Sequence, residues 1–371
     1  YNLLLVIMMK NRIERLFEYI AKEKKNVDCV LVSRSTFPDI NFFYFSNASG
    51  GFFDGSFLIL YPDGTSKLFT STMEQEAAEK SKGDFEIYVY SSRDERIKLL
   101  EEHIKGQNLG LSFTSITYFE VEKLKDTYKG NLIDITKEIN FTRAIKDKAE
   151  IDNIKKASEI TSKTFSEVPD MLVDGLTEKD LSFQIEFQLK KNGAEALSYD
   201  TIAAFGANSS LPHYESSNSP LKKGDFVLLD FAGRYNRYCS DMTRTFFYRK
   251  ASSEQKKIYQ TVLEAQLLGI DELKPGVIAK DVHNAVSKFI DGTEFKGRFI
   301  HSLGHGIGLE THDTIGLSPI SEYTIEENMV LTIEPGVYIP DFGGVRIEDT
   351  LVVRKGKPKI LTTFTKELLI I

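Results

Sequence analysis

The chain has 371 residues, of which 41% are hydrophobic and 27% are charged, and its formal net charge is −7. This composition is ordinary for a globular protein that is long enough for two domains. The lysines and arginines are scattered along the chain, so the sequence predicts no basic surface and no nucleic-acid partner. The two cysteines are far apart, which excludes a disulfide framework and favours a cytoplasmic protein.

The apolar opening, YNLLLVIMM, lacks the features of a targeting or membrane segment. It is far shorter than the ~20 apolar residues that cross a bilayer. It also has no basic residue before the apolar run and no small-residue cleavage site after it. We therefore expect no membrane association and interpret residues 1–8 as an upstream extension, with a short strand or a membrane contact as the alternative.

Residues 9–136 have the pattern of an α/β domain. A predicted amphipathic helix at 11–24 is followed by short apolar runs that alternate with segments of helical character, among them 115–128. The strand-like runs are VDCVLVS, SFLILYP, TSKLFTS, FEIYVY, NLGLS and NLIDI. Such an alternation predicts helices packed on a sheet. We find no cofactor motif in this region, and its one histidine, His103, is expected on the surface.

Residues 140–371 have a different pattern, in which two helices precede a β-hairpin and the same order then recurs. The first set comprises predicted helices at 144–168 and 177–192 and a hairpin at 225–249. The second set comprises helices at 253–273 and 279–291 and a hairpin at 329–353. This recurrence predicts an α+β domain made of two halves whose sheets face a shared site.

The first hairpin carries two acidic residues where packed strand residues are expected. If its turn is centred on residues 235–236, Asp230 lies directly opposite Asp241. Opposed strand residues have Cβ atoms roughly 4.5–5.5 Å apart, and like charges at that distance are destabilising. A positively charged partner is therefore expected between the two aspartates.

The second hairpin repeats this arrangement, because centring its turn on Asp341 places Glu334 opposite Glu348. Before it comes FIHSLGHGIGLETHD, in which three glycines surround His305, as expected where the backbone must approach a ligand closely. Alone, each acid is more often a turn or surface residue, and such a histidine is more often a core residue. Two opposed acid pairs together with this histidine are far harder to explain without a bound cation.

Four carboxylates and one imidazole are a suitable ligand set for two divalent ions of the manganese, cobalt, iron or zinc kind. Bridging carboxylates allow five side chains to hold two ions about 3.5–4 Å apart. Arg346 shares a strand face with Glu348 and is expected to orient it. His301 is expected beside the site rather than as a ligand, and His283 is expected to be structural. His213 lies in the loop before the first hairpin. From its position alone it is equally a functional or a surface residue.

These residues lie in motifs that resemble those of the pita-bread metallopeptidases. The resemblance rests on Asp230, Asp241 eleven positions later, GHGIGLETHD, IEPGVY and GVRIED, in this order. The family includes Xaa-Pro aminopeptidase, prolidase, methionine aminopeptidase and the metal-free creatinase. The resemblance implies a pita-bread domain over 140–371. It also implies that the preceding domain is the creatinase-type domain of the Xaa-Pro aminopeptidase and prolidase branch.

The resemblance also implies a role for each residue. Five would hold the metal pair: Asp230 one ion, His305 and Glu334 the other, and Asp241 and Glu348 both. Glu334 would in addition accept the proton of the attacking water and return it to the leaving nitrogen. His213 and His312 would bind the substrate and stabilise the tetrahedral intermediate. All five ligand positions are filled, which disfavours a creatinase-like hydrolase and a non-catalytic metal-binding interaction module.

The implied activity is the metal-dependent removal of the first residue from short peptides whose second residue is proline, by a homodimer. In prolidases, which cleave Xaa-Pro dipeptides, an arginine that recognises the substrate carboxylate typically follows the second histidine by four residues. That position is Gly316 here, and no arginine occurs between Arg298 and Arg346. The first interpretation is therefore an Xaa-Pro aminopeptidase, and a prolidase is the alternative.

Overall fold

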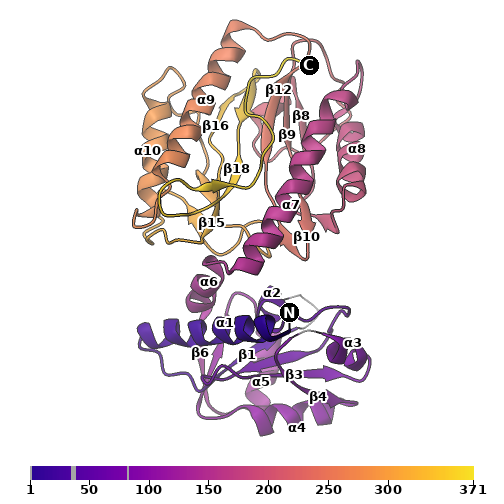
Figure 1. The fold of residues 1–371 in the computed structure, drawn as a ribbon, viewed down its shortest axis with the longest axis vertical. Helices are drawn as coiled ribbons and strands as arrows, with labels where there is room; N and C mark the ends of the chain where they lie inside the picture. The colour runs from indigo at the N-terminus through magenta and orange to yellow at the C-terminus, as the bar shows by residue number, and fades with distance from the viewer. Residues whose placement is uncertain (1, 35–38, 82) are drawn as a thin grey trace. The chain divides into compact units, whose positions relative to one another are not determined.

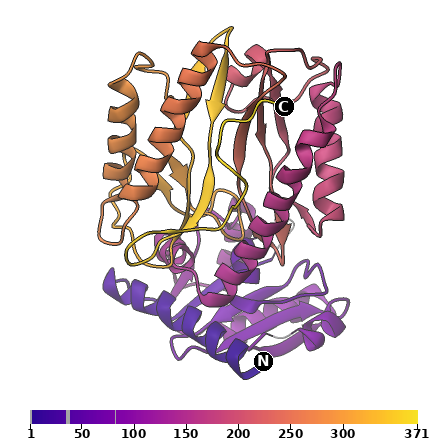
Figure 2. The same cartoon turned by 45° about the horizontal axis from the view of Figure 1, so that its top comes forward.

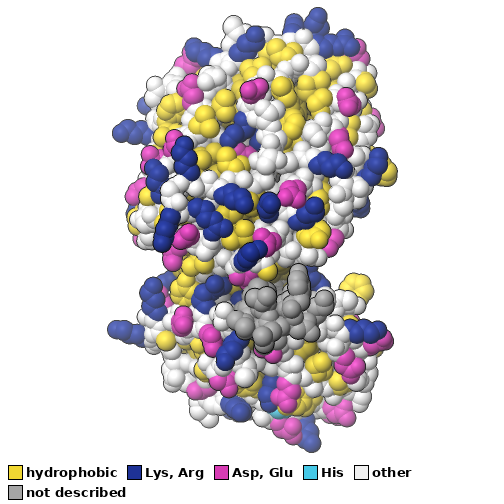
Figure 3. All heavy atoms as spheres, in the orientation of Figure 1, with side chains coloured by type: hydrophobic (Ala, Val, Ile, Leu, Met, Phe, Trp, Pro, Cys, Tyr) yellow, Lys and Arg dark blue, Asp and Glu magenta, His cyan; other side chains and the backbone are white. Residues whose placement is uncertain are grey.

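The computed structural model describes residues 2–34, 39–81 and 83–371, with side chains from residue 10 onward. The chain divides into two compact units, Tyr1–Arg143 and Ala144–Ile371 (Figures 1 and 2). On the face in Figure 3, lysine and arginine side chains are spread over both units with acidic side chains among them. Among the described helices, none is long and apolar enough to cross a membrane.

The first unit is an α/β fold built on one six-stranded sheet, in the order β4-β3-β2-β1-β5-β6. The strands are β1 (Cys29–Ser33), β2 (Phe57–Leu60), β3 (Ser66–Ser71), β4 (Glu86–Tyr90), β5 (Asn108–Leu111) and β6 (Asn131–Asp134). The helices are α1 (Asn2–Lys22), α2 (Ile40–Ser46), α3 (Gln75–Lys80), α4 (Arg93–His103), α5 (Tyr118–Thr127) and α6 (Thr136–Ala144). Leu100 of α4 and Leu124 of α5 pack against the sheet face that carries Leu31 and Phe57, while α1 lies across the opposite face (Figure 1).

Two predicted helices of this unit have different starts in the structure. The helix predicted at 11–24 spans Asn2–Lys22, so a strand over residues 2–8 is excluded. Leu and Met, which are frequent in that run, rank high in helix propensity. The helix predicted at 115–128 begins later, because Thr117 and Glu120 form a capping box at its N-terminus.

The second unit has the predicted arrangement of two helix pairs around acid-bearing hairpins. Figure 1 shows the first pair on one side of the strands and the second pair on the other. The helices are α7 (Lys148–Glu167), α8 (Glu178–Lys191), α9 (Ser253–Glu272) and α10 (Ala279–Asp291), with short 3-10 turns η1 (Val168–Met171) and η2 (Gly206–Ser210). A capping box of Ser252 and Gln255 starts α9, and Thr177 caps α8 by accepting a hydrogen bond from the Asp180 backbone N–H.

The strands of this unit form several small sheets rather than one large one. They are β7 (Ala196–Leu197), β8 (Ile202–Phe205), β9 (Phe226–Asp230), β10 (Gly233–Tyr235), β11 (Tyr238–Cys239), β12 (Thr243–Phe247), β13 (Gly304–His305), β14 (Gly316–Leu317), β15 (Val330–Ile333), β16 (Gly336–Ile339), β17 (Gly343–Arg346), β18 (Asp349–Val352) and β19 (Lys359–Ile360). One hydrophobic core lies between α7, α8 and strands β8, β9 and β12, and another lies between α9, α10 and strands β15 to β18. Each helix pair therefore covers its own hairpin.

The first hairpin has a different register from the predicted one. Its tip is the pair Asn236 and Arg237, whose φ angles of 46° and 69° are both positive, as a two-residue type I′ turn requires. Asp230 consequently lies opposite Thr243, not opposite Asp241. The turn lies one residue later than predicted, which moves each cross-strand partner by two positions. Because strand side chains alternate with a period of two, this shift does not exchange the two faces.

The second hairpin has the predicted register, centred on Asp341. Strands β16 and β17 pair with Gly336 opposite Arg346, and β15 and β18 continue the same register. Residues 334–335, between β15 and β16, and residues 347–348, between β17 and β18, are two-residue breaks in the strand pairing. By the register, Glu334 and Glu348 lie opposite each other in these breaks. The breaks are the points where the chain passes from one small sheet to the next.

A buried charged network lies behind both hairpins. Arg244 of β12 pairs with Asp349 of β18 at 2.8 Å, and both side chains are only 1% exposed. The Arg244 guanidinium also donates to the carbonyl oxygens of Phe364 and Thr365, and Lys366 Nζ lies 2.8 Å from Asp349. Burial alone would raise the pKa of Asp349, but Arg244 and Lys366 outweigh it and hold the pKa below its usual range.

We expect Arg244→Met to lower the free energy of unfolding by about 3–5 kcal/mol, because it leaves the buried Asp349 carboxylate without its main partner. Urea unfolding of the metal-free protein measures this. Lys148→Met is the matched control, because Lys148 pairs with Asp152 on the surface and is 89% exposed. Its effect should stay within about 0.5 kcal/mol. Equal effects of the two substitutions would contradict the importance of the buried pair.

Candidate metal centre

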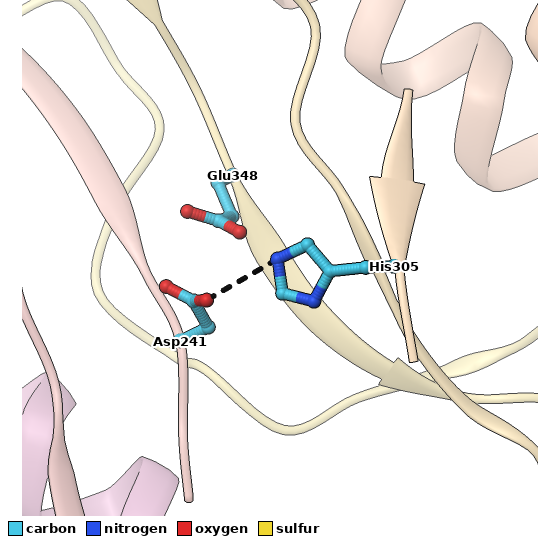
Figure 4. Close-up of side chains that lie close together, drawn as sticks. All are labelled: Asp241, His305 and Glu348. Carbon is cyan, nitrogen blue, oxygen red and sulfur yellow. Dashed lines mark ion pairs between the residues drawn. The ribbon is translucent and has the colours of Figure 1, made fainter. Parts of the chain in front are cut away.

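Three of the predicted ligands converge in one small volume (Figure 4). One potential ligand atom from each of Asp241, His305 and Glu348 lies within 4.8 Å of the others. They come from three different segments: Asp241 precedes β12, His305 ends β13, and Glu348 lies in the break before β18. His305 Nε2 is 3.5 Å from Asp241 Oδ2. The two hairpins and the glycine-rich segment therefore meet at this point.

The remaining two predicted ligands adjoin this cluster. Glu334 Oε1 lies 3.3 Å from His305 Nε2. Asp230 is connected through Tyr199, whose hydroxyl is 2.5 Å from Asp230 Oδ1 and also contacts Asp241 Oδ1. The structure thus brings all five residues that were predicted as ligands to one site.

Burial and mutual repulsion act on the carboxyl groups of this site. Desolvation is the main cause that raises the pKa of Asp241, Glu334 and Glu348 well above its usual value. A neighbouring carboxylate is the second cause in each case: Asp230 for Asp241, Glu348 for Glu334, and Asp241 for Glu348. Desolvation also lowers the pKa of His305 to about 4, so its ring is neutral and has a lone pair for a metal.

The polar atoms of the site fit a pair of divalent ions. Among the described residues, buried Glu348 Oε1 has no hydrogen-bond partner, while Oε2 accepts from the Thr243 hydroxyl at 2.6 Å. The Tyr199 hydroxyl has one proton and cannot donate to Asp230 and Asp241 at once. The carboxylate oxygens can therefore accept more hydrogen bonds than the surrounding protein groups donate. Oxygen ligands with one imidazole suit divalent ions of the manganese, cobalt, iron or zinc kind.

Arg346 contacts a different acid from the predicted one. Its guanidinium donates to Asp230 Oδ2 at 2.6 Å and to the Tyr338 hydroxyl at 2.9 Å. In the described part of the chain, Arg346 makes no hydrogen bond to Glu348. Thr243 links the two, because it accepts from Arg346 Nε at 3.1 Å and donates to Glu348 at 2.6 Å. The shared strand face was read correctly, but Asp230 from the other hairpin lies closer to the guanidinium. Arg346 therefore joins the two hairpins instead of orienting its neighbour in sequence.

A cavity of about 770 Å³ opens beside the site, a volume suited to a small ligand such as a short peptide. His213 and His312 line its wall and are exposed. Desolvation by the surrounding cavity wall, and then the nearby His213, lower the pKa of His312. His301 also lines the cavity, where its Nε2 lies 2.9 Å from the Tyr338 hydroxyl. His283, which the sequence predicted to be structural, is not among the described residues that line the cavity, and it accepts a hydrogen bond from the Leu303 backbone N–H.

The glycines around His305 serve close contacts within the protein, whereas the sequence predicted contact with a ligand. A Cβ atom on Gly304 would lie 2.0 Å from the Thr332 carbonyl oxygen. A Cβ atom on Gly306 would lie 2.2 Å from the Asp313 carbonyl oxygen. These contacts are with backbone atoms that cannot move aside. Glycine is therefore required at 304 for packing against β15 and at 306 for the close approach of Asp313.

Three residues at the site were not found from the sequence: Tyr199, Thr243 and Tyr338. Tyr199 lies between β7 and β8, 31 positions before Asp230, where no strand or helix pattern gives its direction. Thr243 and Tyr338 read as ordinary strand residues. Hydroxyl side chains at strand positions often bond only to the backbone. The sequence therefore did not distinguish Thr243 or Tyr338 as residues of the site.

Comparisons with known proteins identify both parts of the chain. Residues 152–355 match the model of metallopeptidase family M24, and residues 12–145 match the creatinase/prolidase N-terminal domain. An Xaa-Pro dipeptidase of Pyrococcus furiosus is 35% identical over 97% of this chain and 100% of its own length. The structure of an Xaa-Pro dipeptidase from Bacillus anthracis superimposes with a TM-score of 0.90 at 33% identity, covering 98% of this chain and 100% of that one. An X-Pro aminopeptidase structure from Thermotoga maritima has a TM-score of 0.87 at 30% identity, covering 95% and 99%.

We expect Mn²⁺ or Co²⁺ to stabilise the folded protein by about 2.7 kcal/mol at a hundredfold excess over its dissociation constant, since the ion binds the native site only. Thermal unfolding with and without chelator measures the effect. Glu348→Gln should lose most of it. The metal-free variant should be no less stable than the metal-free wild type, because the substitution removes one of the repelling acids.

Glu322→Gln is the control for this experiment. Glu322 pairs with Lys280 and its side chain is 78% exposed. It should bind metal as the wild type does. If Glu348→Gln keeps the full metal-induced stabilisation, the buried oxygen without a partner is not a ligand.

Proposed function

This chain belongs to metallopeptidase family M24 and is a metal-dependent peptidase, and from that premise we propose that it hydrolyses Xaa-Pro dipeptides. The peptidases of this family use a pair of divalent metal ions. Relatives named Xaa-Pro dipeptidase, which match over nearly their full length, support a prolidase better than the aminopeptidase that was the first interpretation of the sequence.

One observation carries the proposal: four acids and a neutral imidazole meet at the wall of a peptide-sized cavity. The buried acceptor atoms of these residues outnumber the hydrogen-bond donors around them. Among the described residues, Glu348 Oε1, for example, has no hydrogen-bond partner. A site that only stabilised the fold would not gather like charges. Release of free proline from Ala-Pro by the manganese- or cobalt-loaded protein tests the proposal directly, and no release from any Xaa-Pro peptide would refute it.

Within this proposal, each of the five residues has a place in the metal site. Asp230 would hold one ion, His305 and Glu334 would hold the other, and Asp241 and Glu348 would hold both. When bound, the two ions lower the pKa of a coordinated water and polarise the peptide carbonyl. Arg346 and Tyr199 keep Asp230 in position by hydrogen bonds to its two oxygens.

Glu334, in its second role, and the two histidines of the cavity wall act on the attacking water and the substrate. Glu334 accepts the proton of the attacking water and returns it to the proline nitrogen as the bond breaks. His213 and His312 donate to the carbonyl oxygen, where negative charge develops. The lowered pKa of His312 makes it a neutral donor at neutral pH. A bond before proline is a tertiary amide without an N–H, so the site needs no acceptor at that position.

A second candidate, an Xaa-Pro aminopeptidase for longer peptides, is favoured by the charge of the cavity wall. Among the described lining residues, Arg346 is the one lysine or arginine, and it already binds Asp230. Gly316 lines the cavity at the position where the prolidase pattern has an arginine. A free carboxylate after the proline therefore meets no unengaged guanidinium on this wall. A longer peptide, which continues as an amide, does not need one.

We expect kcat/KM to be at least about tenfold higher on Ala-Pro than on Ala-Pro-Ala. A hydrogen bond from an uncharged donor to the charged carboxylate of the dipeptide is worth about 1.5–3 kcal/mol and does not require a guanidinium. Ala-Pro-amide is the matched control, because it keeps the dipeptide's size and lacks only the charge. It should be cleaved as slowly as the tripeptide. Faster cleavage of the tripeptide and the amide would assign the protein to the second candidate.

We expect His312→Ala and His213→Ala to lower kcat by about 10²–10³, the usual effect of losing one oxyanion donor. The bound metal, measured by elemental analysis, should stay at the wild-type level, because neither histidine is among the five proposed ligands. If metal is lost together with the imidazole, that histidine is a ligand and its proposed role is wrong.

A further inference from the structure

The segment that carries both His305 and His312 is a closed loop. Gly306 N–H donates to the Ile315 carbonyl at 2.6 Å, and Asp313 N–H donates to the Gly306 carbonyl at 2.8 Å. The rings of His305 and His312 lie with their centroids 4.2 Å apart. The direction of the His312 ring therefore depends on how this loop is held next to His312.

A buried ion pair holds the loop at the residue that follows His312. Asp313 Oδ2 lies 3.0 Å from Lys146 Nζ, and the two side chains are only 2% and 1% exposed. Lys146 precedes helix α7, and its backbone N–H donates to the Asn328 carbonyl at 3.0 Å. A Cβ atom on Gly308 would lie 2.1 Å from Asp313 Oδ2 and 2.9 Å from Lys146 Nζ. The pair thus has no room to move towards the loop.

The residue after this pair has an unfavourable backbone conformation. Thr314 has a φ of +62°, which is a genuine outlier for a β-branched residue. Such a conformation persists only where the surrounding structure enforces it, and it occurs most often at functional sites. The residue before Thr314 is Asp313, which is held by its ion pair with Lys146. The residue after Thr314 is Ile315, whose N–H donates to the Asp313 carbonyl at 2.7 Å.

We propose that Lys146 and Asp313 are positioning residues, which lock the strained turn at Thr314 and so direct the His312 ring into the cavity. This deepens the proposed function, on which it rests. A buried ion pair is weak evidence for stability, because apolar residues of similar size often stabilise a fold as well or better. Its place between His312 and a strained residue fits a pair that determines geometry.

The main test is a double-mutant cycle with the metal-loaded protein and an Xaa-Pro peptide. Lys146→Met should lower kcat by at least about tenfold with little change in KM, since a misplacement of 1 Å can reduce a rate about 10²-fold. In a His312→Ala background the same substitution should change kcat by less than about twofold, because the residue it acts through is gone. Lys148→Met, at the exposed start of α7, is the control and should behave as the wild type in both backgrounds. An equal factor in both backgrounds would overturn the proposal.

Two further measurements separate positioning from stability. In the metal-free protein, hydrogen exchange at the Asp313 and Ile315 amides should be faster in Lys146→Met, and unchanged exchange would overturn the proposal. The double variant Lys146→Met with Asp313→Leu removes both charges of this pair together and should unfold at a higher temperature than Lys146→Met. Its kcat should nevertheless stay as low as that of Lys146→Met, and wild-type kcat would overturn the proposal. If the wild type cleaves no Xaa-Pro peptide, the proposed function fails, whereas an active wild type with an equally active Lys146→Met refutes this inference alone.

Discussion

The repulsion among four carboxylates in one buried site is the constraint on which the catalytic unit depends. No pair of facing strands could hold such acids alone, because opposed like charges destabilise a hairpin. The protein meets the constraint by placing two acids on each of two hairpins and joining the hairpins through donors. Arg346 of the second hairpin binds Asp230 of the first, and Thr243 of the first binds Glu348 of the second. Arg346 supplies one positive charge for four acids, and the metal pair of the family's peptidases supplies the rest.

Further bonds between the two hairpins lie next to the site. Arg244 donates to the Glu348 carbonyl and pairs with Asp349, and Thr350 donates to the Asp241 carbonyl at 2.8 Å. The break that carries Glu348 is therefore fixed by Arg244 of the first hairpin, and the backbone at Asp241 is fixed by Thr350 of the second. Since a ligand must be held within a few tenths of an ångström for metal binding, the stiffness of this contact zone is a condition of function.

Much of the fold and the ligand set could be predicted from the sequence, because both depend on local patterns. Alternating runs revealed the sheet of the first unit, and the repeated order of helices and hairpins revealed the two halves of the second. The register of the first hairpin was wrong, since nothing in the pattern shows that Asn236 and Arg237 form the turn. The partner of Arg346 and the site of Tyr199 depend on contacts between distant segments, which periodicity cannot reveal. The fixed positions of His312 and Lys146 depend on the same kind of contact.

The bonds from Arg244 to the carbonyls of Phe364 and Thr365 have a consequence for biosynthesis. On the ribosome, both hairpins emerge before this segment, and a domain completes its folding only when all its parts are available. Until residues 364–366 appear, the buried guanidinium and Asp349 lack three of their partners. The ligand geometry is therefore completed only after residues 364–366 have been translated. A nascent chain that stalls earlier would expose an unfinished site to chaperones and proteases before it could bind metal.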